Sequence, residues 1–170
     1  LAWVELPTNA EVKLFNARGK PVADNYNEAF EMAINEWCTH VITVEDDQVL
    51  EHDTIIKLMK FALANTDCCV GARYPKRQKT REGVHIIVDG WHRQFLEDDG
   101  EIHEVKTLAM WCSIYPVKIL RQLELPWCKT TWALSQDSYL TQKIRDSWYK
   151  CLVDTSIKIW HKDKDWTIYY

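Results

Sequence analysis

Apolar positions in the first half of the chain switch repeatedly between strand-like and helix-like spacing. Residues 12–15 alternate as in a short strand, and residues 24–37 carry apolar side chains three and four positions apart behind an aspartate suited to cap a helix. Residues 40–44 are a β-branched run typical of a strand covered on both faces. Residues 53–63 repeat the capped helical pattern, and residues 68–73 are again strand-like. This order of strand, helix and strand predicts an α/β domain.

The second half of the chain has weaker patterns. Ser135 is placed to cap a helix, and Asp98-Asp99-Gly100 is typical of a hairpin turn. The expected elements are strands at 84–88, 110–115, 151–153 and 157–159 and helices at 116–123 and 136–146. Together the two halves predict one mixed α/β domain spanning residues 1–170, with a mainly parallel sheet flanked by helices.

Composition narrows the class of protein. The 170 residues are 46% hydrophobic and 27% charged, as in an ordinary globular domain, and 21 Lys and Arg against 25 Asp and Glu exclude a surface that is basic all over. No apolar stretch reaches the roughly 20 residues of a membrane span, and the start lacks the features of a signal peptide. The six cysteines are scattered without a C-x-x-C pair, which favours buried, reduced thiols over a zinc or disulfide framework. We therefore expect a soluble, cytoplasmic protein.

Three carboxylates follow the strand at residues 40–44. Glu45, Asp46 and Asp47 stand at its carboxyl end, where open α/β sheets bind ligands. Like charges crowded there repel one another unless a cation or solvent offsets them, and a hard divalent ion completed by phosphate oxygens is one resolution. The other interpretation is that the acids enter a solvated loop and cap the next helix.

Asp137 and His161 also end or begin elements. Asp137 lies in the first turn of the helix expected after Ser135. It is either a general base or simply a negative charge of the kind favoured at a helix N-terminus. His161 follows the strand expected at 157–159. It is either a metal ligand or an ordinary surface or interface histidine. Taken with the acids after residue 44, the set suggests a base that is separate from a metal pair.

Basic and aromatic side chains supply further candidates. The segment 73–81 holds Tyr74 and five cations, which form either a solvated loop or a lid over a diphosphate or anionic acceptor; the cations are Arg73, Lys76, Arg77, Lys79 and Arg81. Among the nine tryptophans, Trp91, Trp111 and Trp132 are candidates to stack on a sugar ring, although such residues also serve as core.

The order of these motifs resembles the GT-A fold glycosyltransferases, in particular the small family-2-like enzymes, over about residues 12 to 165. Residues 40–49 are similar to the strand that ends in the Asp-x-Asp signature, with Glu45 in the first acidic place and Asp47 in the second. Residues 132–140 look like the Glu-Asp motif that supplies the base, and 144–161 match the pattern leading to a metal-binding histidine.

A weaker match joins residues 23–29 to an Arg-Asn-x-Ala helix start, with Asn27 kept and Tyr26 in place of the arginine. Gln136 replaces the usual glutamate before the base, and residues 107–110 replace a Gly-rich turn. GT-A domains open with a strand and helix that bind the base. Because little precedes Val12 to supply them, the resemblance implies that part of this nucleotide-binding segment is lacking.

The resemblance implies a metal-dependent transfer from a nucleotide-diphosphate sugar of UDP or GDP type. Asp47 and His161 would hold Mn²⁺ or Mg²⁺, and the imidazole favours Mn²⁺. Glu45 would reach the metal through water or touch the ribose. Asp137 would be the base of an inverting reaction, with a retaining outcome as the open alternative. The residues implied for donor binding are Glu45, Asp46, Asn27, Arg73, Lys76 and Arg77. On the acceptor side they are Trp91, Trp111, Trp132 and Gln136.

The acceptor is left open between a glycan, a small molecule, a protein and a nucleic acid. Two other functions compete with sugar transfer. A sugar-phosphate nucleotidyltransferase needs a Gly-rich, Arg-containing phosphate loop near its start, and the sequence shows none. A non-catalytic sugar- or nucleotide-binding domain remains an alternative because Glu45 and Gln136 depart from the family pattern.

Overall fold

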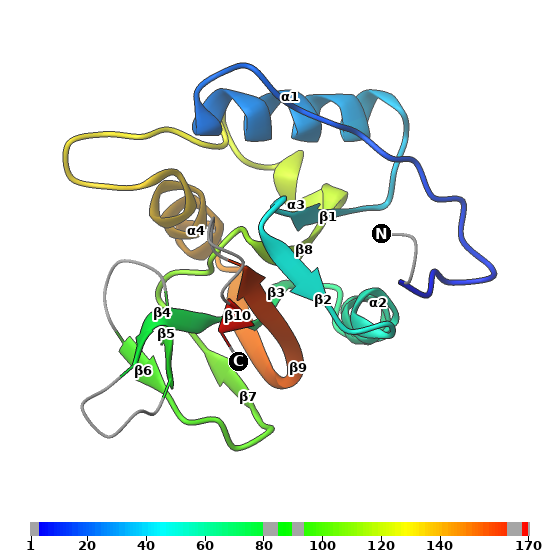
Figure 1. Cartoon of the computed structure of the whole chain (residues 1–170). Helices are drawn as coiled ribbons and strands as arrows, with labels where there is room; N and C mark the ends of the chain where they lie inside the picture. Colours follow the sequence, from blue (N-terminus) through cyan, green and yellow to red (C-terminus); the bar gives the residue numbers. More distant parts are fainter. Residues whose placement is uncertain (1–3, 80–84, 90–93, 163–167, 170) are drawn as a thin grey trace.

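The computed structural model describes residues 4–79, 85–89, 94–162 and 168–169 of the chain. Helices and strands alternate irregularly along it (Figure 1). In chain order they are α1 (Val22–Asn35), β1 (His40–Val44), β2 (Gln48–Leu50), α2 (Thr54–Ala64), β3 (Cys68–Arg73), β4 (Pro75–Lys79), β5 (His85–Asp89), β6 (Gln94–Leu96), β7 (Ile102–Glu104), β8 (Cys112–Pro116), α3 (Val117–Leu120), α4 (Gln136–Asp146), β9 (Lys150–Lys162) and β10 (Ile168–Tyr169).

The main sheet is mixed and mostly antiparallel. Its strands follow the order β1-β8-β3-β9-β10, and β2 and β7 also pair with β9. In the described part of the chain only the β3–β9 pairing is parallel, and the five other pairings of this sheet are antiparallel. A separate three-stranded antiparallel sheet contains β4, β5 and β6. The predicted Rossmann-like, mainly parallel sheet flanked by helices is therefore wrong.

The reason for this error is the strand that lies between β1 and β3. Both strands pair antiparallel with β8, so they run in the same direction, as a strand-helix-strand order predicts. They are not neighbours, however, because Ile114 of β8 lies between Ile42 and Val70. The local pattern gives the direction of a connection but not the strand that is inserted from elsewhere in the sequence.

The long strand β9 makes the sheet curve. Its first half pairs with β3 and β7, and its last residues pair with β2 and β10. Between these halves the β3 register jumps, from Ala72 opposite Asp154 to Arg73 opposite Lys158, which is an irregularity that bends a strand. The sheet consequently curls towards a partly closed barrel (Figure 1).

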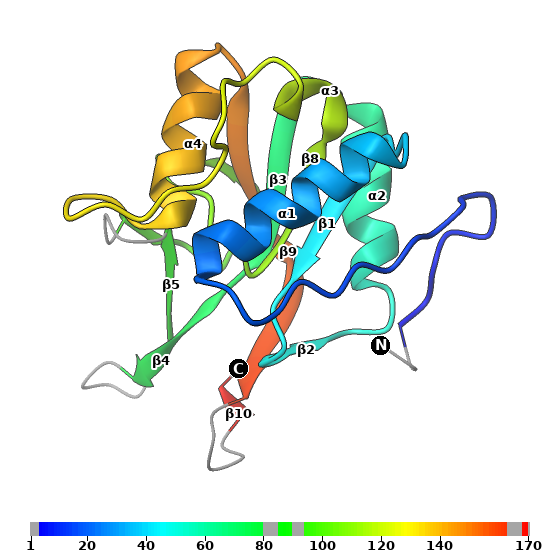
Figure 2. The same cartoon turned by 90° about the horizontal axis from the view of Figure 1, so that it is seen from above.

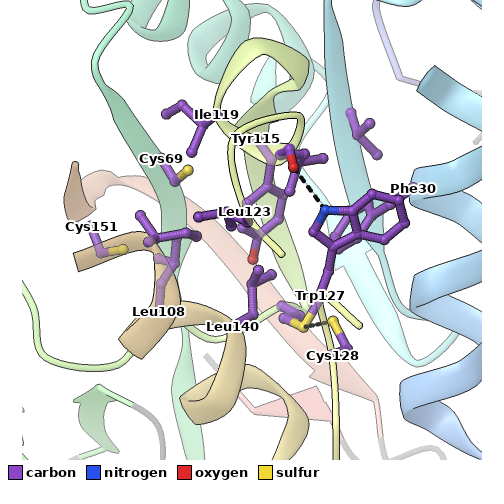
Figure 3. Close-up of a cluster of buried hydrophobic side chains, with 14 of the residues drawn as sticks. Phe30, Cys69, Leu108, Tyr115, Ile119, Leu123, Trp127, Cys128, Leu140 and Cys151 are labelled. Carbon is purple, nitrogen blue, oxygen red and sulfur yellow. Dashed lines mark hydrogen bonds between the residues drawn. The ribbon is translucent and has the colours of Figure 1, made fainter. Parts of the chain in front are cut away.

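Two apolar clusters position the helices. Helix α1 lies across the strands in Figure 2, and its Phe30 packs edge-on against Tyr115 of β8 and against Trp127, with ring centroids 5.5 and 6.1 Å apart (Figure 3). The same cluster includes buried side chains of α3 and α4. Leu58 of α2 belongs to the second cluster together with Val70 of β3. Burial of these side chains holds α1, α3 and α4 against the sheet in the first cluster and α2 in the second.

Several predicted elements are confirmed. The strands at 40–44 and 68–73 and the helix at 136–146 have the predicted bounds, and the helices expected at 24–37 and 53–63 form with shifts of one or two residues. A strong hydrophobic period or a β-branched run specifies these segments locally, so neighbours in space were not needed to find them.

Other elements differ from the prediction. Residues 12–15 form no strand, and Leu14 is 76% exposed because no sheet edge receives it. The two closing strands at 151–153 and 157–159 are one strand, β9, which includes His161. The basic segment after Arg73 contains β4 rather than only a loop. The turn at 98–100 leads from β6 to β7, but these strands pair with β5 and β9 instead of with each other.

Candidate functional site

The pairing of β2 with β9 brings Asp47 and His161 together. Asp47 ends the short turn between β1 and β2, and Gln48 then lies opposite His161 in the antiparallel register. The backbone N–H of Lys162 donates to the carbonyl oxygen of Asp47 at 2.9 Å. In this arrangement His161 Nε2 lies 2.8 Å from Asp47 Oδ2. Two residues that the sequence placed 114 positions apart therefore meet, as the predicted metal pair requires.

Tyr74 contacts the other side of the same imidazole. It directly follows β3, and its hydroxyl lies 2.7 Å from His161 Nδ1. Tyr74 is 8% exposed and His161 only 1%. Sequence reasoning noted Tyr74 only as a neighbour of the basic segment. The signal in the sequence that could have marked Tyr74 is its position directly after β3, a buried strand whose carboxyl end lies at the same edge of the sheet as that of β1.

Glu45 is held by a tyrosine from α1. The Tyr26 hydroxyl donates to Glu45 Oε1 at 2.9 Å. Burial raises the pKa of Glu45 to about 7 against the lowering effect of this hydrogen bond, and the charges of three further carboxylates, Asp47, Asp137 and Asp46, raise it too. Burial and the charge of Glu45 also raise the pKa of Tyr26, so the phenol remains a donor. Glu45 thus lies among the acids that the sequence singled out.

Asp137 lies in the first turn of α4 and is 5% exposed. Its Oδ1 accepts a hydrogen bond from the backbone N–H of Ser138 at 2.9 Å and another from the hydroxyl of Ser135. Among the described residues no hydrogen bond holds its other oxygen, Oδ2. Besides burial, the charge of Asp137 contributes to the raised pKa values of Glu45 and Tyr26, so this carboxylate faces the same region. The structure therefore places the predicted base near Glu45.

Asn27 connects α1 to the loop that precedes α4. Its side-chain amide donates to the carbonyl of Cys128, and its side-chain oxygen accepts from the Cys128 N–H, both at 2.8 Å. Both polar atoms of the Asn27 side chain are therefore bonded to the loop that contains Cys128 and hold it against α1. A hollow of about 370 Å³ opens beside them, lined by Pro21, Ala23, Asp24, Asn27, Pro126, Cys128, Lys129 and Thr130.

The cations predicted to bind the donor are only partly described. Arg73 ends β3, is 9% exposed and pairs with Asp98 at 2.9 Å. Its buried Nε has no hydrogen-bond partner within the described residues. Lys76 and Arg77 lie in β4, for which only the backbone is described, and Arg81 lies outside the described residues. Asp46 is exposed in the turn after β1.

The acceptor-side candidates do not form one group. Trp111 precedes β8 and packs its ring against Tyr74, which places it beside the imidazole of His161. Trp132 is fully exposed on the loop that leads into α4. Gln136 is the first residue of α4, next to Asp137. Trp91 lies outside the described residues.

The donor set fits a divalent cation that uses few protein ligands. Within the described parts of the chain no three His, Cys, Asp or Glu side chains form a metal-binding group, so Asp47 and His161 stand as a pair. Adjacent ligands of an octahedral ion with bonds of about 2.1 Å lie about 3 Å apart, close to the 2.8 Å between Asp47 Oδ2 and His161 Nε2. Water and ligand oxygens are the usual source of the remaining bonds.

Comparisons with known proteins show a similar fold. No protein-family model and no curated protein matches the sequence. The crystal structure of A197 from STIV matches with a TM-score of 0.62 and 14% sequence identity, over 89% of this chain and 76% of that chain. At this identity the likeness concerns the fold and does not indicate an activity. Within the described residues no helix is both long and apolar enough to cross a bilayer.

The raised pKa of Glu45 predicts a pH-dependent stability in the absence of divalent ions. Between pH 4.5, the ordinary pKa of a glutamate, and about pH 7, Glu45 holds a proton in the folded protein that it has lost in the unfolded chain. The free energy of unfolding therefore falls as pH rises through this window, by at most about 3 kcal/mol and less where solvent screens Glu45.

In Glu45→Gln this part of the pH dependence should disappear, because the amide does not titrate but still accepts from Tyr26. We expect the variant to be more stable than the natural protein at pH 8 and close to it below pH 5. Urea unfolding in EDTA across this range measures both. The exposed Glu31, changed to Gln, is the matched control on α1. Parallel profiles for Glu45→Gln and the natural protein would contradict the expectation.

Proposed function

We propose that the chain is a metal-dependent glycosyltransferase that moves a sugar from a nucleotide-diphosphate sugar to an acceptor hydroxyl. The observation that carries the proposal is the 2.8 Å contact between Asp47 and His161, formed just after β1. The buried carboxylate of Asp137 acts on the nearby Glu45. A carboxylate, an imidazole and a separate carboxylate in one region match the needs of a cation-assisted displacement. The resemblance of the motifs to the glycosyltransferases agrees with this chemistry.

Asp47 and His161 would hold the divalent cation, and a mixed oxygen and nitrogen donor set favours Mn²⁺ over Mg²⁺. When bound, the cation offsets the charge that builds on the diphosphate leaving group. Crowding of Glu45, Asp46 and Asp47 supports a cation here, because burial and then the charges of the neighbouring carboxylates raise the pKa of Glu45 in its absence.

Asp137 would act as the general base. The acceptor hydroxyl attacks the anomeric carbon and its proton passes to Asp137 Oδ2, while the bond from the anomeric carbon to the diphosphate breaks. Ser138 N–H and Ser135 Oγ fix Oδ1 and so orient the carboxylate. Attack from the face opposite the leaving group gives inversion. A retaining reaction would instead place the acceptor on the leaving-group side.

Other side chains near the site would contribute to donor and acceptor binding. Arg73 has a buried Nε without a described partner, which supports a role towards an anionic donor. Trp132 and Gln136 precede Asp137 in the sequence and would supply an exposed indole and an amide on the acceptor side. Trp111 instead packs beside Tyr74 and His161.

A thermal-shift screen tests the proposal. Sugar conjugates of UDP and GDP are added with Mn²⁺ or with EDTA, and we expect one nucleotide class to raise the melting temperature only with Mn²⁺. A ligand at 100 times its Kd stabilises by about 2.7 kcal/mol, which is readily measured. A shift that EDTA does not change contradicts the metal role. A shift given by both the nucleotide sugar and a nucleoside triphosphate, followed by pyrophosphate release, favours a nucleotidyltransferase.

The thiols support a reducing compartment. All six cysteines are free, and five of them are buried. Burial raises the pKa of Cys112 to about 12 and that of Cys69 well above its ordinary value, which keeps these thiols inert. We place the protein in the cytoplasm on this basis.

A further inference from the structure

Both ring nitrogens of His161 have hydrogen-bonding partners of different chemistry. Asp47 Oδ2 lies 2.8 Å from Nε2, and the Tyr74 hydroxyl lies 2.7 Å from Nδ1. A neutral imidazole carries one N–H and one lone pair, so each tautomer demands one donor and one acceptor from its partners. An ionised carboxylate only accepts, whereas a phenol can donate or accept. Tyr74 is thus the partner that can satisfy either tautomer.

We propose that Tyr74 is a positioning residue for His161, which holds Nε2 towards Asp47 and lets the ring proton occupy either nitrogen. In the metal-free protein Nε2–H donates to Asp47, and Nδ1 accepts from the Tyr74 hydroxyl. For Nε2 to offer its lone pair to a cation, the ring proton has to lie on Nδ1, where it donates to the Tyr74 oxygen. The imidazole holds one proton in both states, so this exchange releases none from it.

The surroundings of the phenol make this contact a fixed one. Tyr74 is 8% exposed and belongs to the apolar cluster of α2, β3 and β9, and its ring also contacts Trp111. His161 is 1% exposed, which leaves little room for water to replace the hydroxyl. Partners on the second nitrogen of a metal-binding histidine set the ring orientation, and their loss typically weakens metal affinity about 10- to 100-fold.

Tyr74→Phe tests the inference because it keeps the ring and removes only the hydroxyl. Mn²⁺ titration followed by electron paramagnetic resonance should show a Kd about 10- to 100-fold weaker than in the natural protein. Tyr149→Phe is the matched control. The Tyr149 hydroxyl also donates a hydrogen bond, to Gln122 Oε1 at 2.7 Å, but neither residue belongs to the site. The Kd of this variant for Mn²⁺ should be unchanged. A purely structural role for Tyr74 predicts a lower melting temperature in EDTA with the natural Mn²⁺ affinity, which would overturn the proposal.

A second measurement does not depend on any metal. Long-range ¹H–¹⁵N spectra of the imidazole, assigned with a His161→Asn variant, identify the tautomer directly in EDTA. We expect the Nε2–H form in the natural protein, because the Asp47 carboxylate only accepts. Tyr74→Phe removes the contact that fixes the ring, so its imidazole signals should broaden or double, whereas those of Tyr149→Phe should not. An Nδ1–H ring in the natural protein, or a single sharp signal in Tyr74→Phe, overturns the inference.

Although the inference rests on the proposed function for its biological meaning, the two can fail separately. A natural protein that binds no Mn²⁺ contradicts the sugar-transfer proposal, and the metal-free spectra still decide the role of Tyr74. Natural Mn²⁺ affinity in Tyr74→Phe leaves the function standing and removes the positioning role.

Discussion

Asp137→Asn is expected to bind Mn²⁺ and the nucleotide sugar as the natural protein does and to lose sugar transfer. A positioned general base typically contributes about 10²- to 10⁴-fold to a rate, which corresponds to roughly 3–5 kcal/mol of activation free energy. The asparagine keeps a side-chain oxygen where Oδ1 accepts from Ser138 and Ser135, so the first turn of α4 should remain intact. The amide cannot take a proton from the acceptor hydroxyl.

The measurement is single-turnover transfer with the donor identified by the thermal-shift screen, together with calorimetry of donor binding. Asp146→Asn is the matched control, because Asp146 is the exposed last residue of the same helix. Its rate and donor affinity should equal those of the natural protein. Normal turnover by Asp137→Asn would place the base elsewhere, whereas donor binding without turnover in the natural protein itself would favour the non-catalytic alternative.

The pairing of Asp47 with His161 was predicted from the resemblance to the glycosyltransferases, and local pattern placed each residue beside a strand. A β-branched run followed by acids marks the carboxyl end of β1, and an alternating segment leads to His161 in β9. Such residues gather at one edge of a sheet whenever their strands run in the same direction. Local pattern does not give the direction of β9, which runs antiparallel to β8, the strand before it. The resemblance was therefore needed to join the two residues.

Sheet order and the tyrosine contacts could not be predicted in the same way. The insertion of β8 between β1 and β3 and the curl of β9 depend on pairings between distant segments. The alternation of apolar and polar residues along a strand shows which face is buried but does not show which strand lies next to it. Tyr26 replaces the arginine expected from the family pattern, and only its side-chain direction in α1 reveals the bond to Glu45. For Asn27 the motif match predicts a donor contact, which stays a prediction, and the sequence carries no sign of its two hydrogen bonds to the backbone of Cys128.

Asp47→Asn is expected to abolish Mn²⁺-dependent binding of the nucleoside diphosphate. The substitution removes a direct carboxylate ligand, so the loss of Mn²⁺ affinity should exceed the roughly 10- to 100-fold typical of an outer-shell change. Isothermal calorimetry with UDP and GDP, with Mn²⁺ and with EDTA, measures it. Asp67→Asn is the control, since that carboxylate is 81% exposed in a surface pair with Lys118 just before β3. Tight binding of the nucleoside diphosphate that resists EDTA, in the natural protein or in Asp47→Asn, would contradict the role of Asp47.

The same substitution should act in the opposite direction on the metal-free fold. Asp47 uses a different oxygen for each partner, since Oδ1 accepts from the Gln48 side chain at 2.8 Å and Oδ2 lies 2.8 Å from His161 Nε2. The asparagine keeps one oxygen for Gln48, and its NH₂ group can donate to His161 Nε2 once the ring proton lies on Nδ1. The change also removes a negative charge that adds to the effect of burial on the pKa of Glu45. In EDTA above pH 7, where Glu45 is ionised, the variant should therefore be at least as stable as the natural protein. A residue kept for packing alone would lose stability when changed. Lost cation binding together with unchanged or greater metal-free stability distinguishes a ligand from a structural carboxylate.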